Sequence, residues 1–285
     1  MVRFISRCVF FLLLPFYLAG AVYDCFPFFN EIELLKMRLS ELDPYVDYFV
    51  LVESIETQRG DKKPLYFKEN KHLFTEYLPK IVHVEVNENH PELELWEREH
   101  FQRNCILRGL ADCHADDIII ISDLDEIPRP EAIIEYHGIL NPRKRKWVRA
   151  ISDAYSVRMQ VFYFQLNRQT PNGEIWGGGE WRGTVLTNFK TLQEHNPQFF
   201  RDHRNAWPCL TSWGWHFTWI GGRDMVRQKL GSVVEGDPNA DKLSDEEIDR
   251  WMNQESRVVS VDASFPLYIQ NNEKYLKTIE FVAEN

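Results

Sequence analysis

The sequence predicts an α/β protein with a Rossmann-type, mostly parallel sheet flanked by helices, followed by a second half of shorter strands. Three observations support this prediction. The run of four isoleucines at 118–121 is typical of a strand buried on both faces, as in the centre of a parallel sheet. Strand-like and helix-like segments alternate up to about residue 147. Acidic residues follow the isoleucine strand directly, where ligands of open α/β sheets bind.

The first half is predicted to alternate three further strands with two helices. We expect strands at 22–26, 48–52 and 81–86, and helices at 31–39 and 92–110. Asn30, with Glu33 three residues later, is the pattern of a capping box at the first helix. The connection between the first two strands is then a right-handed β-α-β crossover.

The second half is predicted to contain short strands and turns. Residues 157–166 are strongly strand-like, whereas Asn172-Gly173 and the glycines at 177–179 interrupt regular structure. Ser244 with Glu247 is a second capping-box pattern, for a helix that ends at Asn253, and residues 268–282 form a closing segment. The length of 285 residues, with 44% hydrophobic residues, fits one large domain.

The N-terminus has the pattern of a secretory signal. Arg3 and Arg7 precede an apolar stretch at 8–18 and the sequence Ala19-Gly20-Ala21. We therefore expect residues 1–21 to be a signal peptide or a short membrane anchor, and the protein to be membrane-associated or exported through the secretory pathway. The cysteines that remain after cleavage permit two disulfides, although we favour buried or singly paired thiols. They are Cys25, Cys105, Cys113 and Cys209.

The net charge of −10 argues against a nucleic-acid-binding protein, because such proteins carry clustered positive charge. The one dense basic run in the sequence is Arg143-Lys144-Arg145-Lys146. A solvated loop or helix end is the ordinary explanation of such a run. The alternative is contact with an anionic acceptor molecule or a membrane surface.

Asp123 and Asp125 are the strongest candidates for chemistry. Pro128 prevents regular continuation of the preceding strand, so both acids lie at the carboxyl end of a buried strand. Residues two apart on an extended segment point the same way, which predicts that the two carboxylates converge on one hard cation, with Glu126 turned aside. The alternative is that these acids are loop residues that cap a helix at 130–136.

Several short segments, in order along the chain, share a further pattern. They are residues 23–31, 46–54, 98–104, 123–128 and 214–217, with a glycine pair at 221–222. Together these segments resemble glycosyltransferase family 17, a family of nucleotide-sugar enzymes with the GT-A fold. The resemblance implies one GT-A-like domain over residues 22–285, in which residues 22–146 bind the nucleotide sugar and residues 147–285 bind the acceptor.

The resemblance also implies an activity. We expect an inverting, metal-dependent glycosyltransferase that moves N-acetylglucosamine from UDP-GlcNAc to a β-mannoside of a glycan or glycoprotein, as in N-glycan processing. Mn²⁺, or Mg²⁺ in its place, would stabilise charge on the leaving diphosphate. A surface polysaccharide or a lipid-linked oligosaccharide is the alternative acceptor. Two other classes stay open, a metal-dependent phosphate-ester hydrolase and a non-catalytic glycan-binding module.

Candidate metal and donor residues follow from the same resemblance. The expected metal ligands are Asp123, Asp125 and His216, with Asp123 also near the ribose. By sequence alone, a single histidine among tryptophans is more often a packed core residue. The expected donor-binding residues are Glu53, Arg103, Asn104, Asp123 and Gly221, while Arg98 is expected at the surface or in an ion pair.

The acceptor side depends on residues of the second half. Inversion requires a carboxylate base, and Glu180 is the first candidate because it lies in a glycine-rich loop, with Asp153 and Asp202 as competitors. Trp176 and Trp181 flank the same glycines and are the expected platforms for an acceptor sugar. Ordinary core packing is the alternative for both tryptophans.

Overall fold

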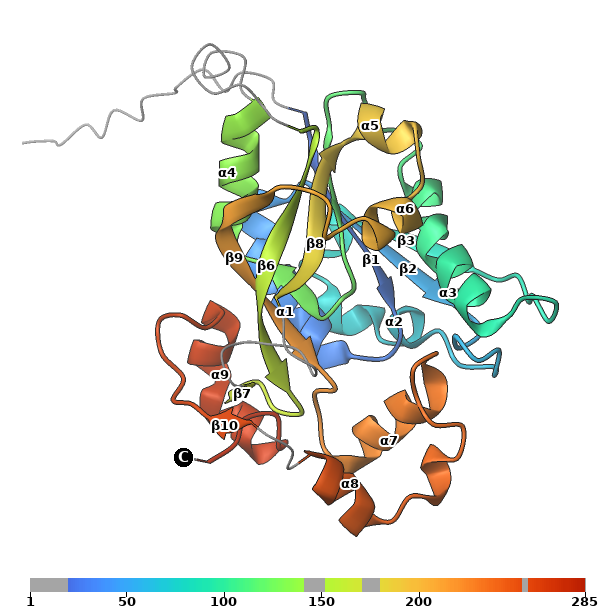
Figure 1. The fold of residues 1–285 in the computed structure, drawn as a ribbon, viewed down its shortest axis with the longest axis vertical. Coiled ribbons are helices and arrows are strands. Elements are labelled where there is room, and N and C mark those ends of the chain that lie inside the picture. Colours follow the sequence, from blue (N-terminus) through green and yellow to red (C-terminus); the bar gives the residue numbers. More distant parts are fainter. Residues whose placement is uncertain (1–19, 141–151, 171–179, 253–255, 285) are drawn as a thin grey trace, which may run out of the picture.

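The structure, a computed structural model, describes residues 20–140, 152–170, 180–252 and 256–284 (Figure 1). The N-terminal stretch up to residue 19, the basic run at 143–146 and the predicted turns at 172–173 and 177–179 lie outside these residues. No helix within the described ranges is long and apolar enough to cross a membrane. Within the same ranges the cysteines are free thiols: Cys25, Cys105, Cys113 and Cys209.

Parallel strands form the first half of the fold, as predicted. They are β1 (Val22–Phe28), β2 (Tyr48–Ser54), β3 (Ile81–Val86) and β4 (Ile118–Ile121), in the spatial order β3-β2-β1-β4. Helix α1 (Ile32–Leu42) connects β1 to β2, and α3 (Leu95–Asn104) precedes β4. The isoleucines of β4 are all buried and alternate between two hydrophobic cores, with Ile118 and Ile120 in one and Ile119 and Ile121 in the other. The predicted strand with two buried faces is therefore confirmed.

The second half extends the same sheet, mainly with antiparallel strands. β8 (Trp181–Asn188) pairs antiparallel with β4, and β6 (Ala154–Tyr163) pairs antiparallel with β8. β9 (Cys209–Thr218) runs parallel to β6 and also pairs with the short strand β5 (Glu126–Pro128). The edge is completed by β7 (Arg168–Gln169) and β10 (Arg257–Val258). Pairing of β5 with β9 brings the residues after Asp125 beside His216.

Helices cover both faces of this sheet (Figure 1). One core packs α1, α4 (Pro130–Leu140) and α9 (Leu267–Thr278) against the sheet. The other core packs the residues after α3 together with α5 (Phe189–Gln193) and α6 (Pro197–Asp202). A third, smaller core joins α7 (Arg223–Ser232) and α8 (Asp245–Met252) to the end of β6. The short helix α2 (Tyr66–Glu69) follows β2.

The two predicted capping boxes have different outcomes. At Ser244 the prediction is confirmed, since Glu247 N donates to Ser244 Oγ at 3.2 Å and Ser244 N donates to Glu247 Oε2 at 2.8 Å. At Asn30 it is wrong, because α1 begins at Ile32 and its N-cap residue is Glu31. The amide of Asn30 instead donates to Gln228 in α7 at 2.9 Å, which links the two halves of the chain.

A fully buried ion pair between Arg38 and Asp24 fixes the loop after β4. Arg38 Nε and Nη2 donate to the two carboxylate oxygens of Asp24 at 2.7 and 2.6 Å. Arg38 Nη1 donates to the backbone carbonyl oxygens of Asp123, Leu124 and Glu126, at distances between 3.0 and 3.1 Å. Neither side chain of the pair is exposed to solvent. One arginine of α1 therefore holds the backbone of the acidic turn in place.

We expect Arg38→Met to lower the free energy of unfolding by about 3–5 kcal/mol, because it leaves the Asp24 carboxylate buried without its partner. Urea unfolding measures this change. The matched control is Arg108→Met, since Arg108 and its partner Glu88 have side chains 41% and 45% exposed, and such pairs contribute about 0–1 kcal/mol. Equal losses in the two variants would contradict the role that we assign to Arg38.

Candidate functional site

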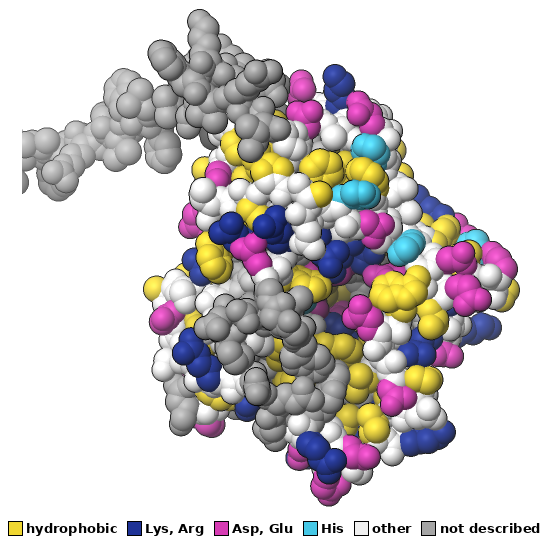
Figure 2. Space-filling view, in the orientation of Figure 1, with side chains coloured by type: hydrophobic (Ala, Val, Ile, Leu, Met, Phe, Trp, Pro, Cys, Tyr) yellow, Lys and Arg dark blue, Asp and Glu magenta, His cyan; other side chains and the backbone are white. Residues whose placement is uncertain are grey.

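A pocket with a volume of about 480 Å³ lies beyond the carboxyl ends of β1, β2 and β4. Figure 2 shows a hollow on this face, with acidic and basic side chains around it. The lining comes from the loops after these three strands, from α3, α6 and α7, and from β8 and β9. It includes Phe29, Glu31, Thr57, Arg103, Asp123, Asp125, Arg201, His216 and Lys229. Segments far apart in the sequence thus meet where the acidic motif was predicted to bind a ligand.

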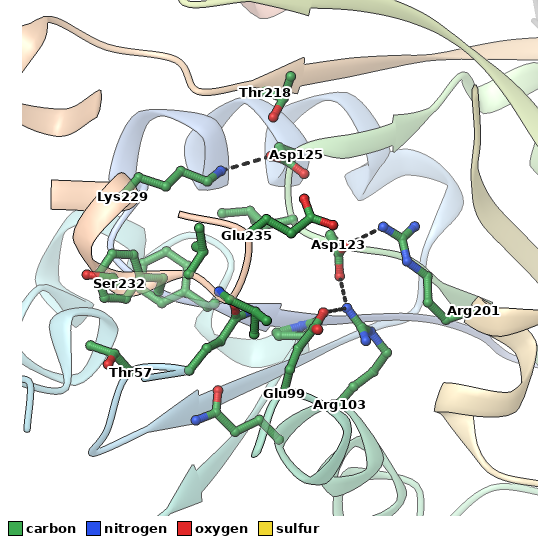
Figure 3. Close-up of a pocket in the computed structure, with 18 of the residues that line it drawn as sticks. Thr57, Glu99, Arg103, Asp123, Asp125, Arg201, Thr218, Lys229, Ser232 and Glu235 are labelled. Carbon is green, nitrogen blue, oxygen red and sulfur yellow. Dashed lines mark hydrogen bonds and ion pairs between the residues drawn. The ribbon is translucent and has the colours of Figure 1, made fainter. Parts of the chain in front are cut away.

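Asp123 lies between two arginines (Figure 3). Its Oδ1 accepts a hydrogen bond from Arg103 Nη2 at 2.8 Å, and its Oδ2 is 2.8 Å from Arg201 Nη2. Burial raises the pKa of Asp123, but the two guanidinium charges outweigh this effect and hold the pKa well below its usual range. Asp123 is therefore an ionised carboxylate whose charge is already balanced by protein side chains.

Glu126 shares one of these arginines and is fully buried. Arg201 Nη1 donates to Glu126 Oε1 and Oε2 at 2.7 and 2.8 Å, and Trp181 Nε1 donates to Oε1 at 2.8 Å. A Cβ on Gly183 would lie 2.5 Å from the carboxyl carbon of Glu126, so this close approach requires glycine. Burial raises the pKa of Glu126, but the charge and hydrogen bonds of Arg201, together with His216, lower it below its usual range.

Asp125 has different partners (Figure 3). Its Oδ2 accepts from Lys229 Nζ at 3.1 Å, and the same ammonium lies 3.4 Å from Glu31 Oε1. Burial lowers the pKa of Lys229, but these two carboxylates raise it above its usual range, so the lysine is charged. Asp125 Oδ1 is 3.7 Å from His216 Nε2. Burial lowers the pKa of His216 more than the nearby acids raise it, so the imidazole is neutral at pH 7.

The expected convergence of Asp123 and Asp125 on one cation is not found. Residues 123–126 form a turn in which Glu126 N donates to Asp123 O at 3.1 Å, so the alternation of an extended strand does not apply. Both oxygens of Asp123 contact arginines, and Asp125 faces α7. Among the residues that the structure describes, no three acidic, histidine or cysteine side chains form a group that could hold a metal ion.

Asp125 and His216 nevertheless fit part of a divalent-cation site. They offer one carboxylate oxygen and one imidazole nitrogen, 3.7 Å apart, at the wall of the pocket. His216 Nδ1 is buried and has no hydrogen-bond partner among the described residues, so no second bond fixes the tautomer of this ring. Mg²⁺ sites typically use one or two protein ligands and take the remaining oxygens from substrate phosphates and water. The pair therefore suits such an ion together with a phosphate-bearing ligand.

The predicted donor-binding residues divide into two groups. Arg103 and Asp123 line the pocket, whereas Glu53, Asn104 and Gly221 do not. Glu53 is fully buried and accepts hydrogen bonds from two backbone N–H groups of α2. Its carboxylate therefore holds a helix and does not face the pocket. Asn104 Oδ1 accepts from the backbone N–H of Gln198 at 3.0 Å. Gly221 has φ of 125° in the turn before α7, a conformation that favours glycine.

Of the predicted base candidates, Asp202 lines the pocket, at the end of α6, and Asp153 and Glu180 do not. Asp202 Oδ1 accepts from Gln198 Nε2 at 2.8 Å. The carboxylate of Glu180 instead forms ion pairs with arginines of β6 and β8. Asp153 is exposed at the start of β6.

The tryptophans of the pocket differ from those expected. Trp181 lines it, but this ring stacks on His216 with centroids 4.8 Å apart and donates to Glu126, so it also supports the acidic turn. Trp176 lies outside the described residues. Trp96 is 50% exposed and lines the pocket at the start of α3.

Sequence reasoning missed Arg201, Lys229 and Glu31. The acids after β4 indicate that lysine or arginine side chains must lie near them, because charges inside a protein require partners. The sequence holds 33 lysines and arginines, however, and Lys229 is 104 residues from Asp125. Arg201 and Lys229 reach these acids because α6 and α7 pack against the end of the sheet. Local sequence patterns do not predict such long-range packing. Arg98, expected at the surface or in an ion pair, is buried and pairs with Glu56 at 3.3 Å.

Comparison with known proteins gives a family for the chain. The model of a family described as glycosyltransferase family 17 matches residues 17–220. Over 235 residues the chain is 28% identical to the beta-1,4-mannosyl-glycoprotein 4-beta-N-acetylglucosaminyltransferases of Homo sapiens and Rattus norvegicus. These matches cover 73% of this chain and 42% of each relative. The chain thus spans less than half the length of the relatives it matches.

Similarity to solved structures is weak. A Pyrobaculum calidifontis mannosyltransferase, PcManGT, in complex with GDP-Man and Mn²⁺ is 12% identical, with a TM-score of 0.40, over 95% of this chain and 78% of that chain. Glucosyl-3-phosphoglycerate synthase from Mycobacterium tuberculosis, in complex with Mn²⁺, UDP-glucose and glycerol 3-phosphate, is 17% identical, with a TM-score of 0.27. That match covers 50% of this chain and 44% of the synthase.

The ion-paired carboxylates of Asp123 and Glu126 predict how stability depends on pH. The folded pKa values of Asp123 and Glu126 lie below their unfolded values of about 4, so the ion pairs stabilise the fold above about pH 4.5 and lose this effect as the pH falls. We expect Glu126→Gln to lower the free energy of unfolding at pH 7 and to make it fall less steeply below about pH 4.5. Urea unfolding at a series of pH values tests this. An acid dependence as steep as that of an exposed-site control, Glu131→Gln, would contradict it.

Proposed function

This chain belongs to glycosyltransferase family 17, and we propose that it is an inverting, metal-dependent enzyme that transfers N-acetylglucosamine from UDP-GlcNAc to a β-mannoside of a glycan or glycoprotein. Relatives named as beta-1,4-mannosyl-glycoprotein 4-beta-N-acetylglucosaminyltransferases support this choice of donor and acceptor. The proposed context is N-glycan processing in the secretory pathway, in line with the signal-like N-terminus.

The observation that carries the proposal is the position of Asp125 and His216 in a pocket at the carboxyl end of β4. A nucleotide-sugar donor releases a diphosphate, so its site needs positive charge beside the leaving oxygens. Asp125 and His216 would hold Mn²⁺ or Mg²⁺, which supplies that charge when bound. The pocket has the volume of a small-molecule site, and its lining is rich in charged groups that suit an anionic ligand.

Asp123 is proposed to bind the nucleoside rather than the metal. Each of its oxygens accepts one contact from an arginine, and a carboxylate oxygen has a further lone pair. Asp123 can therefore also accept a hydrogen bond from a ribose hydroxyl. Because its pKa is held well below the usual range, this acceptor stays ionised at neutral pH. Arg103 and Arg201 fix its orientation before the donor arrives.

Transfer requires a base on the acceptor side. The acceptor hydroxyl oxygen bonds to the anomeric carbon, its proton passes to a carboxylate, and the bond from that carbon to the diphosphate oxygen breaks, so that UDP leaves with the electron pair. We retain Asp202 as the proposed base, because it lines the pocket and Gln198 fixes its carboxylate. Trp96 and Trp181 line the same pocket and offer apolar rings to an acceptor sugar.

Release of UDP from a panel of UDP-sugars, with a β-mannoside acceptor and Mn²⁺, tests the proposed activity. We expect turnover of UDP-GlcNAc that depends on Mn²⁺ and falls by about 10²–10³-fold in Asp125→Asn, because the leaving diphosphate loses its charge stabilisation. Asp112→Asn, at an exposed acid, is the control and should leave turnover unchanged. Binding of UDP without turnover of any donor on glycan acceptors would instead favour a non-catalytic glycan-binding module.

The choice of base has a separate test. Asp202→Asn should lower kcat by about 10²–10⁴-fold, with UDP binding in the presence of Mn²⁺ unchanged, because only proton transfer is removed. Glu235→Gln is the matched comparison, since Glu235 lines the same pocket. A large loss of kcat in Glu235→Gln, with Asp202→Asn near wild-type activity, would transfer the role of base to Glu235.

A further inference from the structure

Lys229 lies in the wall of the pocket, between the carboxylates of Asp125 and Glu31. Its Nζ is 3.1 Å from Asp125 Oδ2 and 3.4 Å from Glu31 Oε1, and its side chain is 18% exposed. The ammonium also lies 5.7 Å from the centre of the Trp219 ring. Figure 3 shows Lys229 reaching across from α7 to Asp125. The residue lies beyond the stretch of 17–220 that matches the family model, so the family match assigns it no role.

The Lys229 ammonium and the proposed divalent ion would both bind the carboxylate of Asp125. Asp125 offers Oδ1 on the side of His216 and Oδ2 to Lys229. The Lys229 ammonium is 3.1 Å from the carboxylate that would hold the divalent ion, and two cations that share one carboxylate repel each other strongly in a partly buried site. The contact between Lys229 and Asp125 therefore weakens metal binding for as long as no anion accompanies the metal.

Glu31 gives Lys229 a second anchor. It comes from the loop after β1 and lines the same pocket, and its Oε1 lies 3.4 Å from the ammonium, independently of the contact with Asp125. A lysine side chain is a flexible stem with a compact charge and three donors, so it can turn from one oxygen to another without movement of its helix. An anionic oxygen that enters the pocket beside Asp125 would be within reach of the same ammonium.

We propose that Lys229 is a donor-binding residue that neutralises Asp125 in the free protein and transfers its contact to the diphosphate when metal and donor bind together. This inference rests on the proposed function. It makes Lys229 a second positive charge, beside the metal, on the oxygens of the leaving diphosphate. It also makes binding of metal and nucleotide cooperative. The diphosphate draws the Lys229 ammonium away from Asp125, which favours metal binding, and the metal displaces the ammonium from Asp125, which frees it to bind the diphosphate.

The test is the effect of Lys229→Met on Mn²⁺ and UDP binding, measured by electron paramagnetic resonance of free Mn²⁺ and by calorimetry. Without UDP, we expect the variant to bind Mn²⁺ about tenfold more tightly than the wild type, because the competing ammonium is gone. With Mn²⁺ present, we expect it to bind UDP about tenfold more weakly, because the diphosphate loses one partner. The opposite signs separate this role from general damage to the site.

Two further variants test whether the effect depends on the positive charge at position 229 and on its position in the pocket. Lys229→Arg keeps the positive charge, so its Mn²⁺ affinity without UDP should stay near that of the wild type. Lys68→Met removes a lysine that pairs with Glu85 at 52% exposure outside the pocket, and it should change neither affinity. If Lys229→Met does not fold, as thermal unfolding would show, Lys229→Arg still decides: tighter Mn²⁺ binding in that variant would overturn the proposal.

The outcomes also separate this inference from the proposed function. Wild-type protein that binds UDP with Mn²⁺, together with a Lys229→Met variant of unchanged Mn²⁺ or UDP affinity, would overturn the role of Lys229 alone. Wild-type protein that binds no UDP in the presence of Mn²⁺ would overturn the proposed function and this inference with it.

Discussion

The buried guanidinium of Arg38 is the interaction on which the site depends. It pairs with Asp24 of β1 and donates to three backbone carbonyl groups of the turn after β4, with no exposure to solvent. A turn of this kind leaves carbonyl groups without strand partners, and such groups are costly when buried. Because Arg38 satisfies them, Asp123 and Asp125 can leave the sheet in different directions. The pairing of β5 with β9 then holds the far side of the turn.

Charge is divided between two separate groups around this turn. On one side Asp123 and Glu126 are balanced by Arg103 and Arg201, whose planar guanidinium groups each contact more than one acceptor. On the other side Asp125 has a single flexible ammonium and a neutral histidine. The first group is suited to a permanent structure and the second to exchange of partners. Of the two acids, Asp125 is therefore the one to which we assign the proposed cation.

Local patterns predicted the parallel strands of the first half and one capping box of the second half. The buried strand at 118–121 and the capping box at Ser244 depend on short-range periodicity and on hydrogen bonds within four residues. The expectation that Asp123 and Asp125 point the same way assumed an extended segment, where Arg38 holds a turn. Lys229, Arg201 and Trp96 became pocket residues through packing of α7, α6 and α3, and no local signal marks such positions. The strand predicted at 157–166 instead spans Ala154–Tyr163, since Phe164 takes a φ of 66°.

A crystal structure of the protein with Mn²⁺ and UDP, with the metal identified by anomalous scattering, is the most direct measurement. We predict the metal in contact with Asp125 and His216, the diphosphate beside Lys229, and Asp123 still paired with Arg103 and Arg201 while it meets the ribose. Metal bound by Asp123, or UDP bound outside the pocket at the carboxyl end of β4, would contradict the division of roles between the two aspartates.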